Sequence, residues 1–464
     1  MRRVLLLSVT MLVTLLAGLV NVRLYAPSPL ERRTSDVVAE AVSRLEYLRG
    51  TLEDGAAGDA QGLFPEGYFF SYELYGLSWV NVGLRSPVHQ KRALSEARWA
   101  LAHVDSDAGR APFSPNLSPA YGAFYVGWSN WLRGGIVKLS ADPAAPERPQ
   151  LAAETKQLAE VLLASPTPFL PSYPGQAWPV DSVVAVASLA LADEVDAGDY
   201  ANVIGRWLAA SDERRDPATG LLPHTTDPVS GRPLEGARAT SQVVALRFLA
   251  ELDPARARKD WTVFRETFAS TVPGAPGIRE YPRGSSGGGD VDSGPLVFGL
   301  SASASAVGLG TAVLFGDQRT AAELSGLAEA TGFRVGDRYL GGLVPIGDSF
   351  MVWSTTTTGW VSGGGAVEER ADRNWRWPWQ LVSVLVVGPL FALSWLSVRR
   401  RRRGGAGPPV TAPAPAPDET AAPDDAAGPD GGEVPSGAPA RTAGPPAGGK
   451  PAGGPSPDVA GVPE

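Results

Sequence analysis

Hydrophobic and polar positions divide this chain into two uncharged apolar stretches, one near each end, and a long middle segment with helical periodicity. Val4 to Val22 contains no charged residue and follows Arg2 and Arg3. Trp379 to Val398 also lacks charge, and Arg399 to Arg403 follow it directly. As a helix, each stretch is long enough to cross the ~30 Å hydrocarbon core of a bilayer. We therefore predict two transmembrane helices, at residues 4–22 and 379–398.

The arginines predict the orientation of these spans. Basic residues collect on the cytoplasmic side of membrane proteins. Both arginine clusters lie at the outer ends of the chain, so we expect a plasma-membrane protein with both termini in the cytoplasm. The domain between the spans, Leu30 to Arg370, is then extracytoplasmic. A cleaved signal peptide is the alternative for the first span. However, Asn21 to Tyr25 offers no small-x-small cleavage site, which favours an uncleaved signal anchor.

The middle segment reads as mainly helical. Apolar residues of Thr34 to Arg49 recur with a period near 3.6, as on one face of a helix. The predicted helices cover Thr34 to Arg49, Glu96 to Val104, Leu151 to Leu163, Ser182 to Val195, Tyr200 to Ala210, Ser241 to Leu252 and Arg319 to Ala330. Short strands are predicted only near Arg334 to Leu343 and Phe350 to Thr355.

Apolar helices recur along this segment at a spacing of roughly 55 residues, which indicates one repeated supersecondary unit. They start near Phe70, Ala123, Asp181, Thr240, Asp292 and Val352. The helix from Asp181 is apolar on nearly every side and is expected to be buried on all faces, whereas Tyr200 to Ala210 is amphipathic. The unit is thus a hairpin of an inner and an outer helix. Six hairpins closed into a ring form an (α/α)6 toroid; an open solenoid or two helical subdomains remain the alternatives.

Two motifs introduce the inner helices through polar loops. They are Trp178-Pro179-Val180-Asp181 and Gly289 to Pro295, which reads Gly-Asp-Val-Asp-Ser-Gly-Pro. In these motifs and its repeat the chain resembles the α/α-toroid superfamily, which includes six-hairpin glycoside hydrolases, uronyl epimerases and linalool dehydratase/isomerase-like proteins. The resemblance is architectural and implies a toroid over roughly residues 34 to 360. Linalool dehydratase/isomerase chemistry is thought to involve cysteines, and this chain has none, so that activity is not implied.

Composition excludes several classes of chemistry. The absence of cysteine rules out disulfides, thiol nucleophiles and thiolate metal sites. The three histidines form no HExxH motif, so we expect no metal. No Walker or Rossmann fingerprint occurs, and we expect no cofactor. No basic stripe with interleaved aromatics is present, so no nucleic-acid partner is expected.

The net charge of −8 belongs mostly to the end of the chain. Residues 404–464 carry eight acidic side chains against Arg441 and Lys450. Arg399 to Glu464 is therefore predicted to be a basic stop-transfer run followed by a Pro/Ala/Gly-rich tail in the cytoplasm. This tail has too few large apolar residues to offset its ordering entropy, and we expect it to be disordered.

The loops that lead into the inner helices are rich in aromatic, amide and acidic side chains, which together suit a polyhydroxylated ligand. Aromatic rings stack on the C–H faces of sugars, and amides and carboxylates bind hydroxyls. We therefore predict that a cell-envelope glycan or other small polar ligand binds there. The candidate ligand-binding residues are Tyr68, Trp79, Asn81, Trp128, Asn130, Trp178, His224, Tyr281, Asp290 and Trp353.

Glycoside hydrolysis requires two carboxyl groups, one of them protonated. Glu66 or Glu73 could pair with an aspartate across the ring, and we predict Glu73, Asp181 and Asp292 as catalytic. Aromatic neighbours are expected to raise the pKa of a glutamic acid by desolvation. The alternative role for both aspartates is to cap the helix that follows. His224 is either a general base or a structural hydrogen-bonding residue.

Three functions follow from these patterns. The first is an enzyme that acts on cell-envelope carbohydrate by paired-carboxylate acid/base chemistry. The second is a non-catalytic glycan-binding or envelope scaffold protein. A transporter accessory is disfavoured, because neither span contains the charged residues that mark a transport pathway. The sequence identifies no protein partner.

Overall fold

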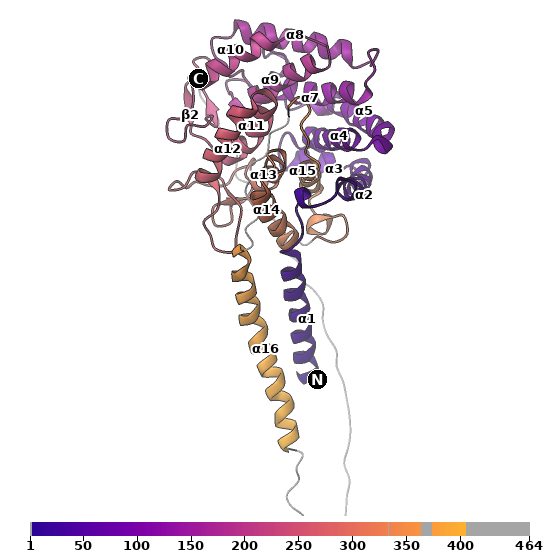
Figure 1. Ribbon diagram of the computed structural model, residues 1–464, viewed down its shortest axis with the longest axis vertical. Coiled ribbons are helices and arrows are strands. Elements are labelled where there is room, and N and C mark those ends of the chain that lie inside the picture. Colours follow the sequence, from indigo (N-terminus) through magenta and orange to yellow (C-terminus); the bar gives the residue numbers. More distant parts are fainter. Residues whose placement is uncertain (1, 333, 363–373, 405–464) are drawn as a thin grey trace, which may run out of the picture. The chain divides into compact units, whose positions relative to one another are not determined.

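The computed structural model describes residues 2–332, 334–362 and 374–404, and it confirms a mainly helical chain with sixteen α-helices among these residues (Figure 1). The only strands described form two small antiparallel pairs. These are β1 (Thr225–Thr226) with β2 (Pro233–Glu235), and β3 (Ile278–Arg279) with β4 (Leu300–Ser301). The tail beyond residue 404, predicted to be disordered, lies outside the described residues.

Six apolar helices form the centre of the domain, and we call them the central helices. They are α4 (Gly67–Arg85), α7 (Gly122–Ser140), α9 (Pro179–Glu194), α11 (Ala239–Leu252), α13 (Ala302–Leu314) and α15 (Pro345–Thr355). Each contacts the next in chain order, and α15 contacts α4. The first and last of these helices, α4 and α15, are therefore neighbours although they are far apart in the sequence.

The other long helices of the domain pack against the central helices, and we call them the flanking helices. They are α2 (Thr34–Glu53), α5 (Gln90–Val104), α8 (Arg148–Ala164), α10 (Ala201–Asp212), α12 (Pro254–Phe268) and α14 (Gln318–Thr331). Each helix that we predicted from sequence is present among these or the central helices, with its ends shifted by a few residues. The short helices α3 (Ala56–Leu63) and α6 (Asp107–Arg110) complete the domain.

Close approach between two central helices depends on a glycine. Val183 and Val184 in α9 are fully buried, as the all-round apolar pattern predicts. Gly127 of α7 faces Ala185 of α9, and a Cβ added to the glycine would lie 2.7 Å from the alanine nitrogen. Only glycine permits this contact between the two backbones.

The structure corrects three predictions about secondary structure. Phe350 to Thr355 is the end of α15 and not a strand, because burial of this segment in the core overrides the strand propensity of its aromatic and β-branched residues. Arg334 to Leu343 forms an isolated bridge and a 3₁₀ turn at Tyr339–Gly342. The fifth central helix begins at Ala302 and not near Asp292, because Ser301 caps it by accepting from the Ala304 amide.

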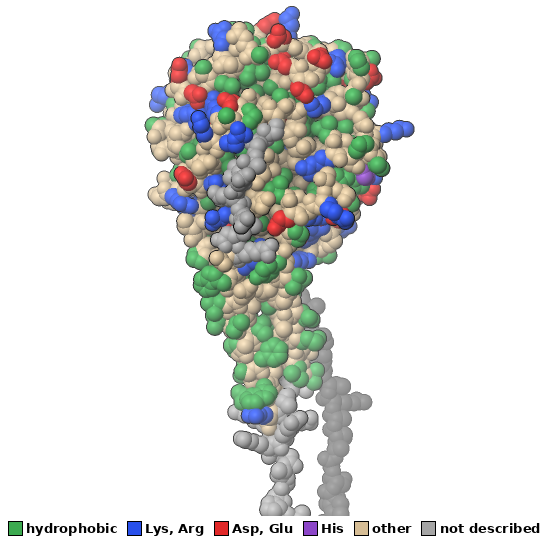
Figure 2. All heavy atoms as spheres, viewed as in Figure 1, with side chains coloured by type: hydrophobic (Ala, Val, Ile, Leu, Met, Phe, Trp, Pro, Cys, Tyr) green, Lys and Arg blue, Asp and Glu red, His purple; other side chains and the backbone are tan. Residues whose placement is uncertain are grey.

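Helices α1 (Arg2–Arg23) and α16 (Trp377–Gly404) are long and apolar enough to cross a membrane. Their side chains are mostly exposed, and Figure 2 shows hydrophobic side chains gathered over them. The two helices contact each other, and α16 continues through Pro389. Two polar pairs join them: Thr10 Oγ1 lies 2.9 Å from Ser394 Oγ, and Asn21 donates to Ser383 at 2.7 Å.

A carboxylate cluster at the starts of the central helices

Three acidic residues from distant parts of the chain act electrostatically on one tyrosine, Tyr173. Glu66 immediately precedes α4, Asp181 lies in the first turn of α9, and Asp292 belongs to the loop between β3 and β4. Tyr173 donates a hydrogen bond from its hydroxyl to Glu66. Burial raises the pKa of Tyr173, and the negative charges of Glu66, Asp181 and Asp292 raise it further. We call these three acids the carboxylate cluster.

A tight turn positions the tyrosine. Pro174 and Gly175 occupy its two central positions, and Gly175 has a φ of 74°. The Gln176 amide donates back to the Tyr173 carbonyl at 3.0 Å. Proline followed by a residue with positive φ is the signature of a type II turn. The turn holds Tyr173 against Glu66 and places Ser172 beside Asp181.

Asp181 is a buried acid that stays protonated at neutral pH. Only 6% of the residue is exposed. Burial raises its pKa to about 8, and the charges of Asp292 and Glu66 add to the increase, while a hydrogen bond with Ser172 opposes it. Asp181 does not cap its helix, since Trp178 occupies the N-cap position and no side chain makes a capping hydrogen bond there.

Asp292 occupies the solvent-exposed side of the cluster. Although the residue is exposed, the surrounding protein removes enough water to raise the pKa of its carboxyl group to about 6. Repulsion from Asp290 and Glu66 adds to the increase, and Arg238 opposes it. Asp292 therefore carries a negative charge at neutral pH beside a protonated Asp181. It is not a helix cap either, because α13 begins after Ser301.

Arg238 borders the cluster and binds several acids at once. Its Nε donates to Glu280 Oε1 at 2.8 Å, and its Nη1 lies 2.5 Å from Asp290 Oδ2. Its guanidinium also lies 5.2 Å from the ring centre of Tyr281. Against the opposing effect of burial, the hydrogen bond from Arg238 lowers the pKa of Asp290 to about 2. Asp290 is thus fixed as an anion next to Asp292.

His224 packs next to Arg238. Its Nδ1 is 2.6 Å from Ser241 Oγ, and its Nε2 is 3.4 Å from Arg238 Nη1. Burial lowers the pKa of His224 to about 3, and the positive charge of Arg238 lowers it further. The imidazole is therefore neutral at pH 7 and is hydrogen-bonded within the protein. These contacts favour the structural alternative for His224 over the general base.

Glu73 lies apart from the carboxylate cluster. The residue is fully buried, and neither of its carboxyl oxygens has a hydrogen-bond partner in the described part of the chain. Burial raises its pKa well above the usual range, and the charges that act on it are Arg133 and Asp105. The charge that raises the pKa values of both Asp181 and Asp292 is that of Glu66, the other glutamate considered for this role.

The ten candidate ligand-binding residues separate into two groups. Trp79, Asn81, Trp128, Asn130 and Trp353 are buried in the core. Trp353, for example, lies 3.4 Å below the guanidinium of Arg247, and Asn81 accepts from Trp360 Nε1 at 2.8 Å.

The second group lies near the carboxylate cluster or beside one of its members in the chain. The ring of Trp178 packs edge-on against Tyr173 at 5.5 Å, and Tyr68 lies two residues after Glu66 in the chain. The other three residues contact Arg238: Tyr281, Asp290 and His224. Neither Ser172 nor Glu280 was among the residues predicted from the sequence. The position of Ser172 directly before the Tyr-Pro-Gly-Gln turn is the one sequence feature that could have indicated its place in the site.

Among the described residues, no three histidine, aspartate or glutamate side chains are arranged to hold a metal ion. Comparison with protein-family models and with curated proteins finds no match to this chain.

Proposed function

We propose that this protein is a membrane-anchored enzyme that acts on cell-envelope carbohydrate by acid/base chemistry at the carboxylate cluster. One feature supports the proposal: burial raises the pKa of Asp181 to about 8, while the pKa of Asp292, whose charge acts on Asp181, is raised only to about 6. Glycoside hydrolysis uses this combination of one acid and one base or nucleophile. Because neither aspartate caps its helix, capping does not account for their positions.

In this mechanism Asp181 is the general acid and protonates the oxygen of the leaving sugar. Asp292, which is exposed, is the base that activates water or the nucleophile that attacks the sugar carbon. Glu66 is a positioning residue, held by Tyr173, whose charge helps to keep Asp181 protonated. Trp178 and Tyr281 provide aromatic rings next to the acids.

We further propose that the six central helices are the inner ring of an (α/α)6 toroid and that the flanking helices are its outer ring. The contact between α15 and α4, which links the last central helix to the first, supports this architecture over an open solenoid. The carboxylate cluster then lies at one rim, because Glu66 and Asp181 both belong to the starts of inner helices.

The proposed orientation places both termini in the cytoplasm and the domain outside the membrane, as the flanking arginines predict. Contacts of α1 support an uncleaved anchor. It packs against α14 and α16, and the Leu24 carbonyl just after it accepts from Arg376 Nε at 2.6 Å. A segment removed on export would not be expected to make such contacts.

Turnover of purified bacterial cell-wall polysaccharide by the full chain in lipid nanodiscs tests the proposal, with new reducing ends as the readout. Loss of a general acid or base costs about 10²- to 10⁴-fold in rate. We expect losses in this range for Asp181→Asn and Asp292→Asn. Asp199→Asn, an exposed substitution in the loop after the far end of α9, is the matched control and should retain full activity.

A non-catalytic glycan-binding protein is the second candidate, and one observation favours it. Trp178 and Tyr281, which are only half-buried, provide aromatic rings beside the acids: Trp178 packs edge-on against Tyr173 at 5.5 Å, and Tyr281 lies 5.2 Å from the Arg238 guanidinium. A protein of this kind would bind polysaccharide without releasing reducing ends, and Asp181→Asn would leave that binding intact. Such a result in the nanodisc assay would contradict the enzyme.

A further inference from the structure

The loop between α14 and α15, residues 334–344, presents large apolar side chains to its surroundings. Val335 is 69% exposed, Leu340 46% and Leu343 84%. These fractions match those of α1, where Leu12 is 56% exposed and Leu15 62%. Burial of apolar area is favourable by about 25 cal/mol per Å². A cluster of exposed apolar residues on one short loop therefore indicates a surface that binds a partner.

The loop has a defined conformation that is fixed by hydrogen bonds to the rest of the domain. Tyr339 at its centre is buried and donates its amide to Asp348 Oδ1 at 2.8 Å. The Leu340 amide donates to the Gly332 carbonyl at 2.7 Å. Leu340 has a φ of 50°, a left-handed conformation that is costly for a branched side chain. The fold therefore holds the apolar side chains on either side of Tyr339 outward at an energetic cost.

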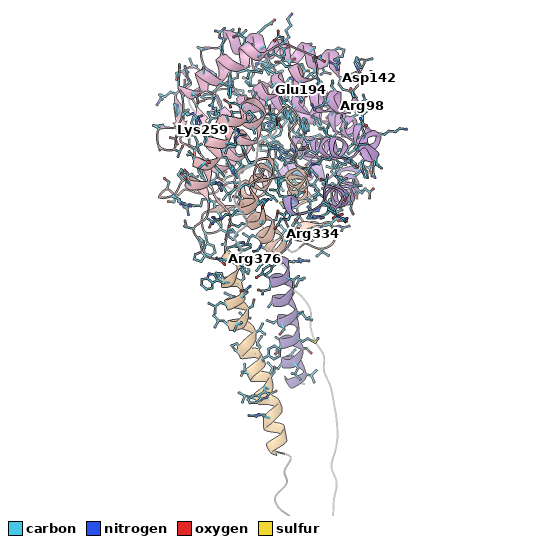
Figure 3. The ribbon with its side chains drawn as sticks, viewed as in Figure 1. Arg98, Asp142, Glu194, Lys259, Arg334 and Arg376 are labelled. Atoms are coloured by element: carbon cyan, nitrogen blue, oxygen red, sulfur yellow. The ribbon has the colours of Figure 1, made fainter. Side chains whose placement is uncertain are left out.

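The loop begins where the apolar helices leave the domain. Arg23, the last residue of α1, donates from Nη2 to the Arg334 carbonyl at 2.5 Å. Figure 3 shows Arg334 and Arg376 close to the domain ends of α1 and α16. Trp377 and Trp379, at the start of α16, are residues typical of the membrane–water interface. The loop and the interfacial tryptophans are thus both adjacent to the ends of the spans.

The same loop carries an arginine, Arg338, between Val335 and Leu340. Arg338 is exposed, and its guanidinium lies 4.4 Å from the ring centre of Tyr47. A basic residue near an anionic membrane surface contributes about 1 kcal/mol to association. Apolar residues flanked by an exposed arginine are the composition of segments that lie in the headgroup region.

We propose that the loop 334–344 inserts Val335, Leu340 and Leu343 into the lipid interface and forms a third membrane contact beside the two spans. The inference rests on the proposed membrane anchoring. The partner is the lipid surface itself, and the contact would fix the tilt of the domain above the bilayer.

The chain has no cysteine, so single-cysteine variants allow a direct test. Leu343→Cys and Val335→Cys in the full chain are labelled with an environment-sensitive fluorophore and reconstituted into vesicles of phosphatidylcholine and phosphatidylglycerol. Two sets of lipids serve as quenchers, one with a nitroxide near the headgroup and one with a nitroxide deep in the acyl chain. Met11→Cys, 64% exposed on α1, is the positive control. Val88→Cys and Val229→Cys, 90% and 74% exposed on the domain, are the negative controls.

We expect a blue-shifted emission at positions 343 and 335 and quenching by shallow nitroxide lipid well above that at 88 and 229. Labels at 343 and 335 that behave like those at 88 and 229 would overturn the inference while leaving the anchoring intact. A blue shift without lipid quenching would mean that a second copy or another protein covers the loop, which also overturns it. If the label at position 11 escapes quenching by nitroxide lipids of any depth, the anchoring itself fails.

A second variant tests the same contact without a label on the critical residue. Leu343→Glu, in the Val335→Cys background, places a carboxylate at the interface and should reduce quenching at position 335 to the level of the negative controls. Val88→Glu is the matched control and should leave it unchanged. Because both altered side chains are exposed, neither change is expected to affect folding.

Discussion

At the residue scale, the feature that matters is the opposite protonation of neighbouring acids. Asp181 is buried against Ser172, and Asp292 is exposed in a loop whose other aspartate is held by Arg238. The same chemical group therefore differs in pKa because its environment differs, which is how enzymes obtain an acid and a base from two carboxyl groups.

This difference predicts a bell-shaped dependence of activity on pH. Activity should fall below about pH 6, where Asp292 becomes protonated, and above about pH 8, where Asp181 loses its proton. Measuring kcat/KM for polysaccharide turnover across this range checks the expectation, because that ratio reports the groups of the free enzyme. A profile flat from pH 5 to 9 would contradict the assignment of both residues.

Stability should also depend on Asp181. Its folded pKa of about 8 lies above the usual value of about 4, so the unfolded chain releases the proton first as pH rises. The free energy of unfolding should therefore fall between about pH 4 and pH 8, by at most about 1.4 kcal/mol per pH unit, and then level off. Asp181→Asn should remove the part of this decline that comes from Asp181, whereas Asp292 and Glu73, whose pKa values are also raised, keep their contributions.

Urea denaturation of wild type and Asp181→Asn at several pH values measures the effect. The two proteins should be most alike near pH 4, and the variant should be the more stable by pH 8. Asp199→Asn, an exposed residue, should follow the wild type throughout. Equal slopes for wild type and Asp181→Asn would show that the acid is ionised in the folded protein.

At the element scale, the contact of α7 with α9 leads to a prediction about glycine. Gly127→Ala places a Cβ 2.7 Å from the Ala185 nitrogen, so two backbones must separate. We expect a loss of about 1–3 kcal/mol in the free energy of unfolding, as for overpacked cores. Gly205→Ala, within α10, meets no atom within 4 Å and should instead be neutral or stabilise by up to about 1 kcal/mol. Chemical denaturation compares the two.

A second element-scale prediction concerns the segment after α15. Glu251 of α11 is 5% exposed and accepts hydrogen bonds from the amides of Trp360, Val361 and Ser362 at 2.8 to 3.2 Å. In a glutamine side chain, an NH₂ group would replace one of these accepting oxygens and would face backbone N–H groups, so hydrogen bonds would be lost. Glu251→Gln should therefore cost roughly 2–4 kcal/mol. Glu194→Gln, whose partner is Lys138 at the surface, should change stability by less than about 1 kcal/mol.

Helices were the part of the fold that the sequence predicted best. Periodicity located α2, α9, α11 and others because an amphipathic or fully apolar helix has a direct signature in the sequence. The repeat placed the start of the sixth helix near Val352, whereas α15 begins at Pro345, and the Met-Val-Trp-Ser-Thr segment was also predicted as a strand from its strand propensity. The segment is helical because it is buried between α13, α2 and α4. Tertiary contacts of this kind lie outside any local pattern.

The site was predictable only in part. The loops before the helices indicated Asp181 and Asp292, and in the structure the charge of Asp292 acts on Asp181; their catalytic role stays a prediction. Glu66 and Glu73 could not be separated, because seven residues along a helix correspond to about 10 Å of depth, and depth depends on how α4 packs. Trp128 and Trp353 looked like binding residues because an aromatic side chain has the same sequence signature in a core and in a site.

At the scale of the whole molecule, the paired helices α1 and α16 predict that the first span is retained. A peptide tag placed before Met1 should remain on the mature protein in membranes, and tags at both ends should be protected from protease added outside intact cells. A tag inserted at Val229, which is 74% exposed, should be cleaved under the same conditions. Loss of the N-terminal tag during export would show that the span is a signal peptide.

The contact between α4 and α15 also constrains how the protein is made. The helices that meet there are separated by about 260 residues of chain, so nearly the whole domain must emerge before its two ends can join. Until then, the apolar sides of both helices lack their final neighbours and are exposed to aggregation. Synthesis of α16 follows within a few dozen residues of α15, and its pairing with α1 brings the two ends of the domain together. Besides their proposed role as membrane anchors, α1 and α16 would thus assist folding by lowering the entropy cost of the last closure.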